Sequence, residues 1–175
     1  GLHETDRAIL AARSMDEIAE AALAHVPHLL DCVRASVMVY HHEEGTMSLL
    51  AVRAPGETRL DKGWRDTVDD AWAPRIQDMA RGATVTIEDV QQAPPGSPWR
   101  DALREEQVQT LVALPLLIED KLIGSLNLGM AKPGALGAEE MTIAREVAIQ
   151  VAIGLHQASL RERLQRHTDQ LEHLV

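Results

Sequence analysis

The sequence contains no phenylalanine, one tyrosine and three tryptophans, so aromatic residues make up only 2 % of its 175 positions. Its core must be mainly aliphatic, because apolar residues still account for 45 % of the chain. The scarcity of aromatic rings argues against the stacking surfaces that bind single-stranded nucleic acids. Basic residues are outnumbered 17 to 27 by acidic ones, and a net charge of −10 argues against a footprint on duplex DNA. We therefore expect no nucleic-acid partner.

Cysteine occurs once, at Cys32, which excludes an internal disulfide and any Cys-x-x-Cys motif for zinc binding or redox exchange. The neighbouring Leu29, Leu30 and Val33 favour a buried structural thiol over a nucleophile. No apolar run approaches the roughly 18 residues that cross a bilayer, and the N-terminal segment lacks a signal-peptide pattern. These absences predict a cytoplasmic location and no membrane segment in this chain.

Motifs for catalysis are also missing. The eight histidines are scattered and form no His-Glu-x-x-His pattern, and no phosphate-binding loop, dinucleotide fingerprint or Gly-x-Ser-x-Gly elbow occurs. We therefore expect no catalytic residue and no metal site, and the chain is predicted not to be an enzyme. Haem stays open as a minority option, because a single axial histidine in an apolar pocket leaves no spacing signature.

The first half of the chain contains clear signals for a helix and a hairpin. Ser14 and Glu17 form a capping-box pair, which predicts a helix that starts near Met15. The alternating, β-branched runs 35–42 and 47–53 flank a glycine and predict a β-hairpin.

The second half alternates helical and extended patterns. Helical spacing over 66–81 precedes a short strand at 83–87, and the two most apolar strands, 108–118 and 121–130, read as partners in one hairpin. A long helix is predicted over 138–175. Helices at both ends of a set of antiparallel hairpins indicate an α+β fold.

The long C-terminal helix changes character half-way along its length. From Ile153 onward, residues recur at heptad spacing and define a seam, which continues too far for the globular part to cover. We expect a homodimer through this helix, and the alternative is a tail that packs against the short first helix. The predicted dimer seam consists of Ile153, Gln157, Leu160, Leu164, His167, Leu171 and Leu174.

All three tryptophans lie in the loop-rich segment 64–99, together with several arginines. Flat apolar rings with interspersed cations suit a pocket for an aromatic or anionic small ligand. The alternative is that these rings replace phenylalanine and cap the aliphatic core. Eight residues are predicted to contact the ligand. Four belong to this segment, and the other four belong to two strands, where alternation places the two residues of each strand on the same face. They are Trp64, Trp72, Arg75 and Trp99 of the segment, and Met38, Tyr40, Ser125 and Asn127 of the strands.

Two consecutive strand sequences resemble those of a known family. Thr-Leu-Val-Ala-Leu-Pro-Leu-Leu-Ile at 110–118, followed by Lys-Leu-Ile-Gly-Ser-Leu-Asn-Leu at 121–128, resembles the paired strands of the GAF domain. This module senses small molecules in bacterial signalling proteins and phosphodiesterases, and residues 139–160 are similar to its closing helix. The resemblance implies a central antiparallel sheet of about five or six strands, with the terminal helices on one face and a helix and loop lid on the other.

The same resemblance implies a division of the chain and a function. Residues 15–158 would form the sensor domain, preceded by a helical lead-in at 1–14 and followed by the start of a coiled-coil signalling linker at 159–175. The domain would bind a small ligand and relay its state to an output domain outside this chain, a histidine kinase or a diguanylate cyclase. One alternative is a structural dimerisation module that binds no ligand. A second alternative is a free-methionine sulfoxide reductase, but that enzyme needs several cysteines and this chain has one.

The departures from the family pattern concern the ligand. Cyclic-nucleotide-binding members carry an Asn-Lys-x-x-x-Phe-like signature, which is incomplete in a chain without phenylalanine. Bilin-binding members attach the chromophore through a cysteine beside a histidine, and residues 100–109 contain neither. Cyclic nucleotide and covalent bilin are therefore both disfavoured at this point, and the ligand is unknown.

Overall fold

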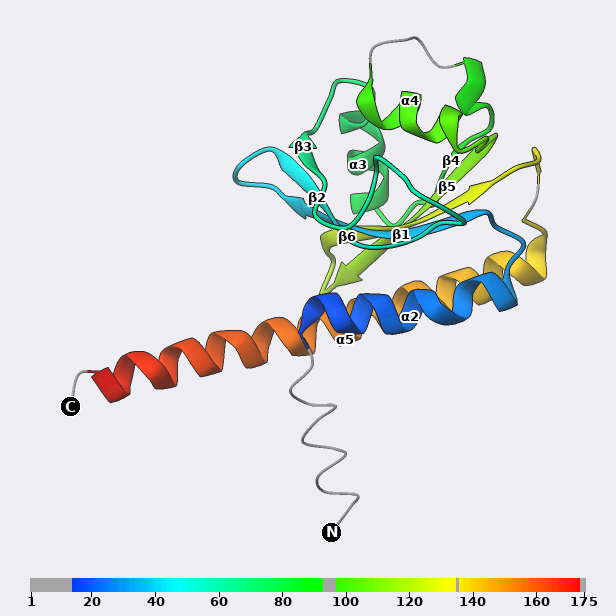
Figure 1. The fold of residues 1–175 in the computed structure, drawn as a ribbon. Coiled ribbons are helices and arrows are strands. Elements are labelled where there is room, and N and C mark those ends of the chain that lie inside the picture. The colour runs from blue at the N-terminus through cyan, green and yellow to red at the C-terminus, as the bar shows by residue number, and fades with distance from the viewer. Residues whose placement is uncertain (1–13, 93–96, 135, 174–175) are drawn as a thin grey trace.

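The computed structural model describes residues 14–92, 97–134 and 136–173. Its six strands form one sheet in the order β3-β2-β1-β6-β5-β4, and every neighbouring pair is antiparallel. Figure 1 shows α2 and α5 on one face of this sheet and α3 and α4 on the other. The α+β prediction and the placement of the lid are therefore confirmed.

The elements are α2 (Met15–Leu29), β1 (Arg34–His41), β2 (Thr46–Arg53), β3 (Arg65–Thr67), α3 (Ala73–Ala80), β4 (Val85–Ile87), the 3-10 helix η1 (Val90–Gln92), α4 (Pro98–Glu105), β5 (Thr110–Ile118), β6 (Lys121–Met130) and α5 (Ala138–His173).

The local signals explain where α2 and the two hairpins form. The Ser14 hydroxyl accepts a hydrogen bond from the Glu17 amide and caps the first turn of α2, as the capping-box pair predicts. Gly45 has a φ of +67° in the β1–β2 turn. Glu119 and Asp120 both have positive φ in the β5–β6 turn, which matches the right-handed twist of the flanking strands.

The helix predicted over 66–81 is wrong in its first half. Residues 65–67 instead form β3, which pairs with the edge of β2, and α3 begins only at Ala73. The Asp69 carboxylate accepts from the Trp72 amide at 2.8 Å, and Pro74 follows in the first turn of α3. A side-chain cap and a proline at this position start a helix rather than continue one.

The core is divided by the sheet into two clusters. On the helical face, aliphatic residues of α2 and α5 pack on the sheet around Leu114, Leu126 and Leu155. Gly154 allows α2 to approach α5 closely, because a Cβ at this position would lie 2.8 Å from the Ile18 Cγ2 atom. On the lid face, the second cluster contains all three tryptophans, Trp64 among its partly buried members.

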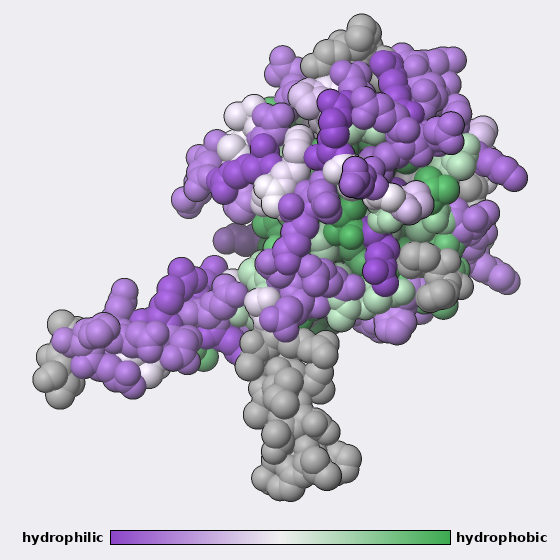
Figure 2. All heavy atoms as spheres, in the orientation of Figure 1, coloured by the Kyte–Doolittle hydropathy of each residue, from purple (hydrophilic) through white to green (hydrophobic). Residues whose placement is uncertain are grey.

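The C-terminal part of α5 projects beyond the sheet (Figure 1), and its visible face is largely hydrophilic in Figure 2. Within this stretch Leu164 is 66 % exposed and Leu171 is 52 % exposed. Ile149, Ile153 and Leu160 are also exposed and continue the same stripe back toward the sheet. The described seam residues are thus uncovered within one chain. Leu174 and residues 1–13 of the predicted lead-in at 1–14 lie outside the described residues.

None of the helices described is both long enough and apolar enough to cross a membrane.

Candidate functional site

A small cavity of about 40 Å³ lies between the sheet and the lid helices α3 and α4. A buried water needs roughly 10 to 15 Å³, so this closed form has room for only a few water molecules. Three polar residues form part of the wall, and the rest of the lining is apolar. The polar residues are Arg34, Ser36 and Asn127; the apolar ones are Met38, Met47, Leu49 and Leu111 from the sheet and Leu60, Trp72, Trp99 and Leu103 from the lid side.

A chain of hydrogen bonds runs from the lid through the sheet beside this cavity. The Trp72 Nε1–H donates to the Tyr40 hydroxyl at 3.0 Å, and an indole N–H can only donate. The Tyr40 hydroxyl lies 2.8 Å from the Ser125 Oγ, which in turn donates to the Asn127 Oδ1 at 2.9 Å. Tyr40 therefore donates to Ser125, and the chain has one direction. Burial raises the pKa of Tyr40 to about 12, although its bonds to Ser125 and Trp72 oppose the shift.

Asp69 holds the two lid helices together at their N-terminal ends. Its Oδ2 accepts from the Trp99 Nε1 at 2.9 Å and from the Ser97 hydroxyl at 3.1 Å, while its Oδ1 accepts from the Trp72 amide. The Trp72 and Trp99 rings meet edge to face with centroids 5.4 Å apart. One carboxylate thus holds the Trp99 indole and the backbone of Trp72, whose own indole is held by Tyr40.

A buried ion pair closes the polar end of the cavity. Arg34 is 4 % exposed, and its Nη1 lies 2.8 Å from the Oε1 of Glu106, which is 11 % exposed. The same guanidinium donates to the Thr58 hydroxyl and to the Leu60 carbonyl. The Thr58 hydroxyl also donates to Glu106 at 2.8 Å. Arg34 is the first residue of β1, and its side chain therefore joins this strand to the end of α4 and to the β2–β3 connection.

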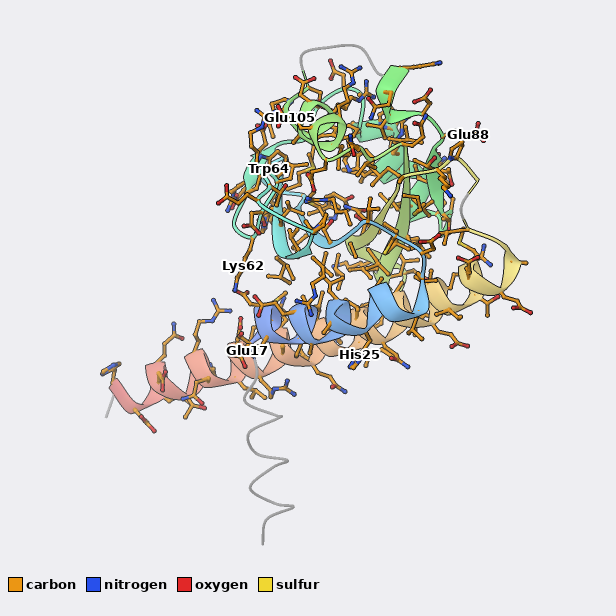
Figure 3. All side chains as sticks on the ribbon, turned by 45° about the vertical axis from the view of Figure 1, so that its right-hand side comes forward. Glu17, His25, Lys62, Trp64, Glu88 and Glu105 are labelled. Carbon is orange, nitrogen blue, oxygen red and sulfur yellow. The ribbon has the colours of Figure 1, made fainter. Side chains whose placement is uncertain are left out.

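Residues 58–62 of that connection, which we call the strap, also reach the helical face. Lys62 extends from the strap toward α2 in Figure 3, and its Nζ lies 2.9 Å from Glu20 and 3.3 Å from Asp16. Hydrogen bonds to Glu20 and then to Asp16 raise the pKa of Lys62. At its other end, Arg59 makes two bonds to Glu105 of α4. The strap is thus bonded both to the lid and to α2, around the edge of the sheet.

The structure brings most of the residues predicted to contact a ligand to one place. Met38, Trp72, Trp99 and Asn127 line the cavity. Tyr40 and Ser125 lie behind that wall and connect it to Trp72 through hydrogen bonds.

Two of the predicted contacts lie elsewhere. Trp64 packs against the lid-side cluster but is not among the residues that line the cavity. Arg75 donates to the Ala71 carbonyl within its own turn and also lies outside the lining.

Sequence reasoning missed Arg34, Ser36 and the strap. Arg34 had a visible signal, because it is a charged residue directly before a run of apolar strand residues. Its partners Thr58 and Glu106 are 24 and 72 positions away, and no local pattern predicts that they meet.

The described residues contain no group of three or more histidine, cysteine or acidic side chains that could hold a metal ion. His41 bonds to the Ser48 hydroxyl and His42 to the Leu122 carbonyl. Cys32 is partly buried, and burial and then Asp31 raise the pKa of its thiol. A protonated thiol is a poor nucleophile, which agrees with a structural cysteine.

A sheet with a helical pair on one face and a bonded lid over a small cavity on the other has the architecture of a regulatory sensor domain. A family model for the GAF domain matches residues 12–156. The chain therefore belongs to the GAF domain family, whose members are regulatory sensor domains rather than catalysts. The resemblance drawn from the strand sequences is confirmed, and so is the prediction that the chain is not an enzyme. No curated protein matches the chain by sequence.

Several solved structures share this fold at low sequence identity. The GAF domain of a two-component sensor histidine kinase from Bacillus halodurans has a TM-score of 0.70 and 16 % identity, over 85 % of this chain and 98 % of its own. The phycocyanobilin-bound GAF domain of a cyanobacterial phytochrome has a TM-score of 0.70 and 19 % identity, over 91 % and 94 %. A phycoerythrobilin-bound GAF domain from a cyanobacterial phytochrome has a TM-score of 0.70 and 18 % identity, over 92 % of this chain and 95 % of its own.

These similar structures correct one expectation about the ligand. The absence of the cysteine and histidine of bilin-binding members from residues 100–109 disfavours covalent bilin. Two of the similar structures are bilin-bound GAF domains of this fold, so this expectation is wrong. A local motif in one segment is too narrow a basis for excluding a ligand class.

Proposed function

We propose that this GAF domain binds a small ligand in the cavity between the sheet and the lid and relays the bound state to an output domain. The observation that carries the proposal is the cavity itself, which is lined by two indoles held by Asp69 and Tyr40 and by three polar residues. Apolar linings with a few convergent polar groups are typical of ligand sites. The ligand classes open to this site include the tetrapyrroles held by similar structures, for which the lid must open further.

The strap supplies a mechanical connection for the relay. A ligand that moves α4 changes the positions of Glu105 and Glu106, and both are bonded to the strap. Lys62 connects the strap to α2, which packs along α5. The exposed ion pairs of Arg59 and Lys62 are individually weak. The buried ion pair of Arg34 and Glu106 is therefore the most important contact between α4 and the rest of this connection.

A second copy of the chain is the partner that we propose for α5. The exposed residues Ile149, Ile153, Leu160, Leu164 and Leu171 follow one stripe from the sheet into the projecting half. A stripe of this kind is buried when two helices pair at heptad spacing. The ligand would bias the arrangement of the two helices, and through it an output domain of the histidine kinase or diguanylate cyclase type. The ligand can bias the two helices only if it binds one of their two arrangements more tightly than the other.

The second candidate function is a structural dimerisation module that binds no ligand. The small volume of the cavity favours it, because the side chains that line it fill most of the space between sheet and lid. The two functions share the dimer and differ only in the occupation of the cavity.

Native mass spectrometry with a visible absorption spectrum tests the proposal on the protein purified from its host. We expect a noncovalent added mass that is lost in L49F, which fills the cavity, and retained in L50F, at a neighbouring strand position outside the lining. An absorption band in the visible region would identify a tetrapyrrole. An added mass that L49F retains would contradict the proposed site, and a dimer with no added mass in any preparation would favour the structural module.

A further inference from the structure

The cavity has two chemically different ends. Trp72 and Trp99 supply flat apolar surface at one end, together with Met38 and Met47, whose flexible thioethers adapt to an aromatic guest. The polar wall is formed by β1 and β6, where Ser36 and Asn127 face each other across the strand pair. Such a lining fits a molecule with an apolar body and one polar head.

The polar wall offers hydrogen-bond donors that the described residues do not use. Arg34 bonds to Thr58 and Glu106 through Nη1 and to Leu60 through one N–H of Nη2. Its Nε–H and one of the two Nη2–H groups have no partner among the described residues. The Asn127 amide accepts from Ser125, but its NH₂ group donates to no described residue, and neither does the Ser36 hydroxyl.

The charge at this wall favours an acidic head over a basic one. Among the described residues that line the cavity, Arg34 is the only titratable one, and Glu106 is the only acidic partner described for it. An arginine guanidinium binds a carboxylate through charge-assisted hydrogen bonds. A cationic head would instead meet a buried guanidinium, which costs free energy.

We propose that the cavity, widened by an outward movement of the lid helices, recognises a compact carboxylate with an aromatic or other apolar body, and that Arg34, with Ser36 and Asn127, binds its carboxylate. This inference rests on the proposed function, because it names the ligand class of the same site. Glu106 acts as an internal competitor for Arg34. A ligand carboxylate that draws the guanidinium toward the cavity weakens the ion pair between Arg34 and Glu106. The end of α4 and the strap are then bound less tightly to β1.

Calorimetric titration of the full chain with matched acids and amides tests this inference. The probes are benzoate, phenylacetate and indole-3-acetate, each paired with its uncharged amide of nearly the same shape. We expect at least one acid to bind about 10-fold or more tightly than its amide, since charge-assisted bonds are stronger than neutral ones. E106Q should raise the affinity for that acid and leave the amide unchanged. The matched control E105Q alters the neighbouring, exposed carboxylate and should change neither.

R34Q should abolish the preference for the acid. If R34Q does not fold, as judged by circular dichroism, S36A and N127A replace it, and each should lower the affinity for the acid by about 5-fold. Equal binding of acid and amide in both the wild type and E106Q would overturn this inference and leave the ligand-sensing function standing. Failure of every probe to bind any folded variant would overturn the inference and count against the proposed site as well.

Discussion

The indole of Trp72 donates its N–H to the hydroxyl of Tyr40 over 3.0 Å, and this bond joins the lid to the central strand β1. Tyr40 is buried among apolar residues, and the direction of its hydrogen bonds keeps its own proton directed at Ser125. The polar chain from lid to sheet therefore depends on a neutral phenol.

Tyr40 should ionise late in the folded protein. Burial raises its pKa from 10.0 to about 12, and it is the only tyrosine in the chain, so tyrosinate absorbance reports on this residue alone. We expect a titration midpoint near pH 12 in the folded protein and near pH 10 in denaturant. The raised pKa contributes stability that is fully present below about pH 10 and is lost as the pH rises toward 12, on the order of 2 to 3 kcal/mol. A midpoint near 10 in the folded state would contradict the buried chain.

Removal of the Asp69 carboxylate should loosen the lid without disrupting the sheet. D69A leaves the Trp99 indole and the Ser97 hydroxyl without their acceptor and removes one of the two acceptors of the Trp72 amide, which keeps the backbone carbonyl of residue 69. This loss should lower the free energy of unfolding by about 2 to 4 kcal/mol. Hydrogen exchange should speed up in α3 and α4 and stay slow in β1 and β6. D70A, at the exposed neighbour, should change stability by less than about 0.5 kcal/mol. Similar losses in the two variants would show that Asp69 does not fix the lid.

Gly124 should tolerate no side chain. A Cβ at this position would lie 2.1 Å from the Met38 carbonyl oxygen of the paired strand, and a backbone atom cannot move aside cheaply. G124A should lower the free energy of unfolding by about 3 kcal/mol or more in urea titrations, at or beyond the usual cost of overpacking. G56A is the control, because a Cβ there meets no atom within 4 Å. Equal stability of the two variants would mean that β1 and β6 pair differently.

The stripe on α5 should control association. L164K puts a charge into the proposed seam, whereas Q165K adds the same charge on another side of the helix. In analytical ultracentrifugation we expect L164K to raise the dimer dissociation constant more than about 10-fold, which corresponds to roughly 1.4 kcal/mol. Q165K should leave it nearly unchanged. A wild-type chain that stays monomeric at all concentrations, or equal effects of the two variants, would exclude this seam.

The elements that the sequence predicts best are those with local causes. The capped start of α2 and the apolar hairpin of β5 and β6 depend on residues a few positions apart, and both form as expected. Residues 66–72 misled the helix prediction, because the cap at Asp69 and the pairing of β3 with β2 outweigh helical spacing over a short segment.

The candidate site was predictable only in part, for the same reason. Alternation pairs Met38 with Tyr40, and Ser125 with Asn127, on one face of each strand, since it depends only on strand geometry. It leaves open which face looks toward the lid, and the fold places Met38 and Asn127 at the cavity. Arg34 was missed because its role comes from Thr58 and Glu106, which the fold alone brings to it. Arg75 was chosen for its charge, but its guanidinium is used within its own turn.

The most direct test of the ligand site is a fluorescence titration of W64F. In this variant Trp72 and Trp99 are the remaining tryptophans, and both line the cavity. Titration with benzoate and phenylacetate should change the tryptophan emission in a saturable way, and the cavity-filling double variant W64F/L49F should require at least about 10-fold more ligand, a loss of roughly 1.4 kcal/mol. Unchanged emission with both acids and their amides, or the same titration curve in the filled variant, would contradict a ligand site between the sheet and the lid.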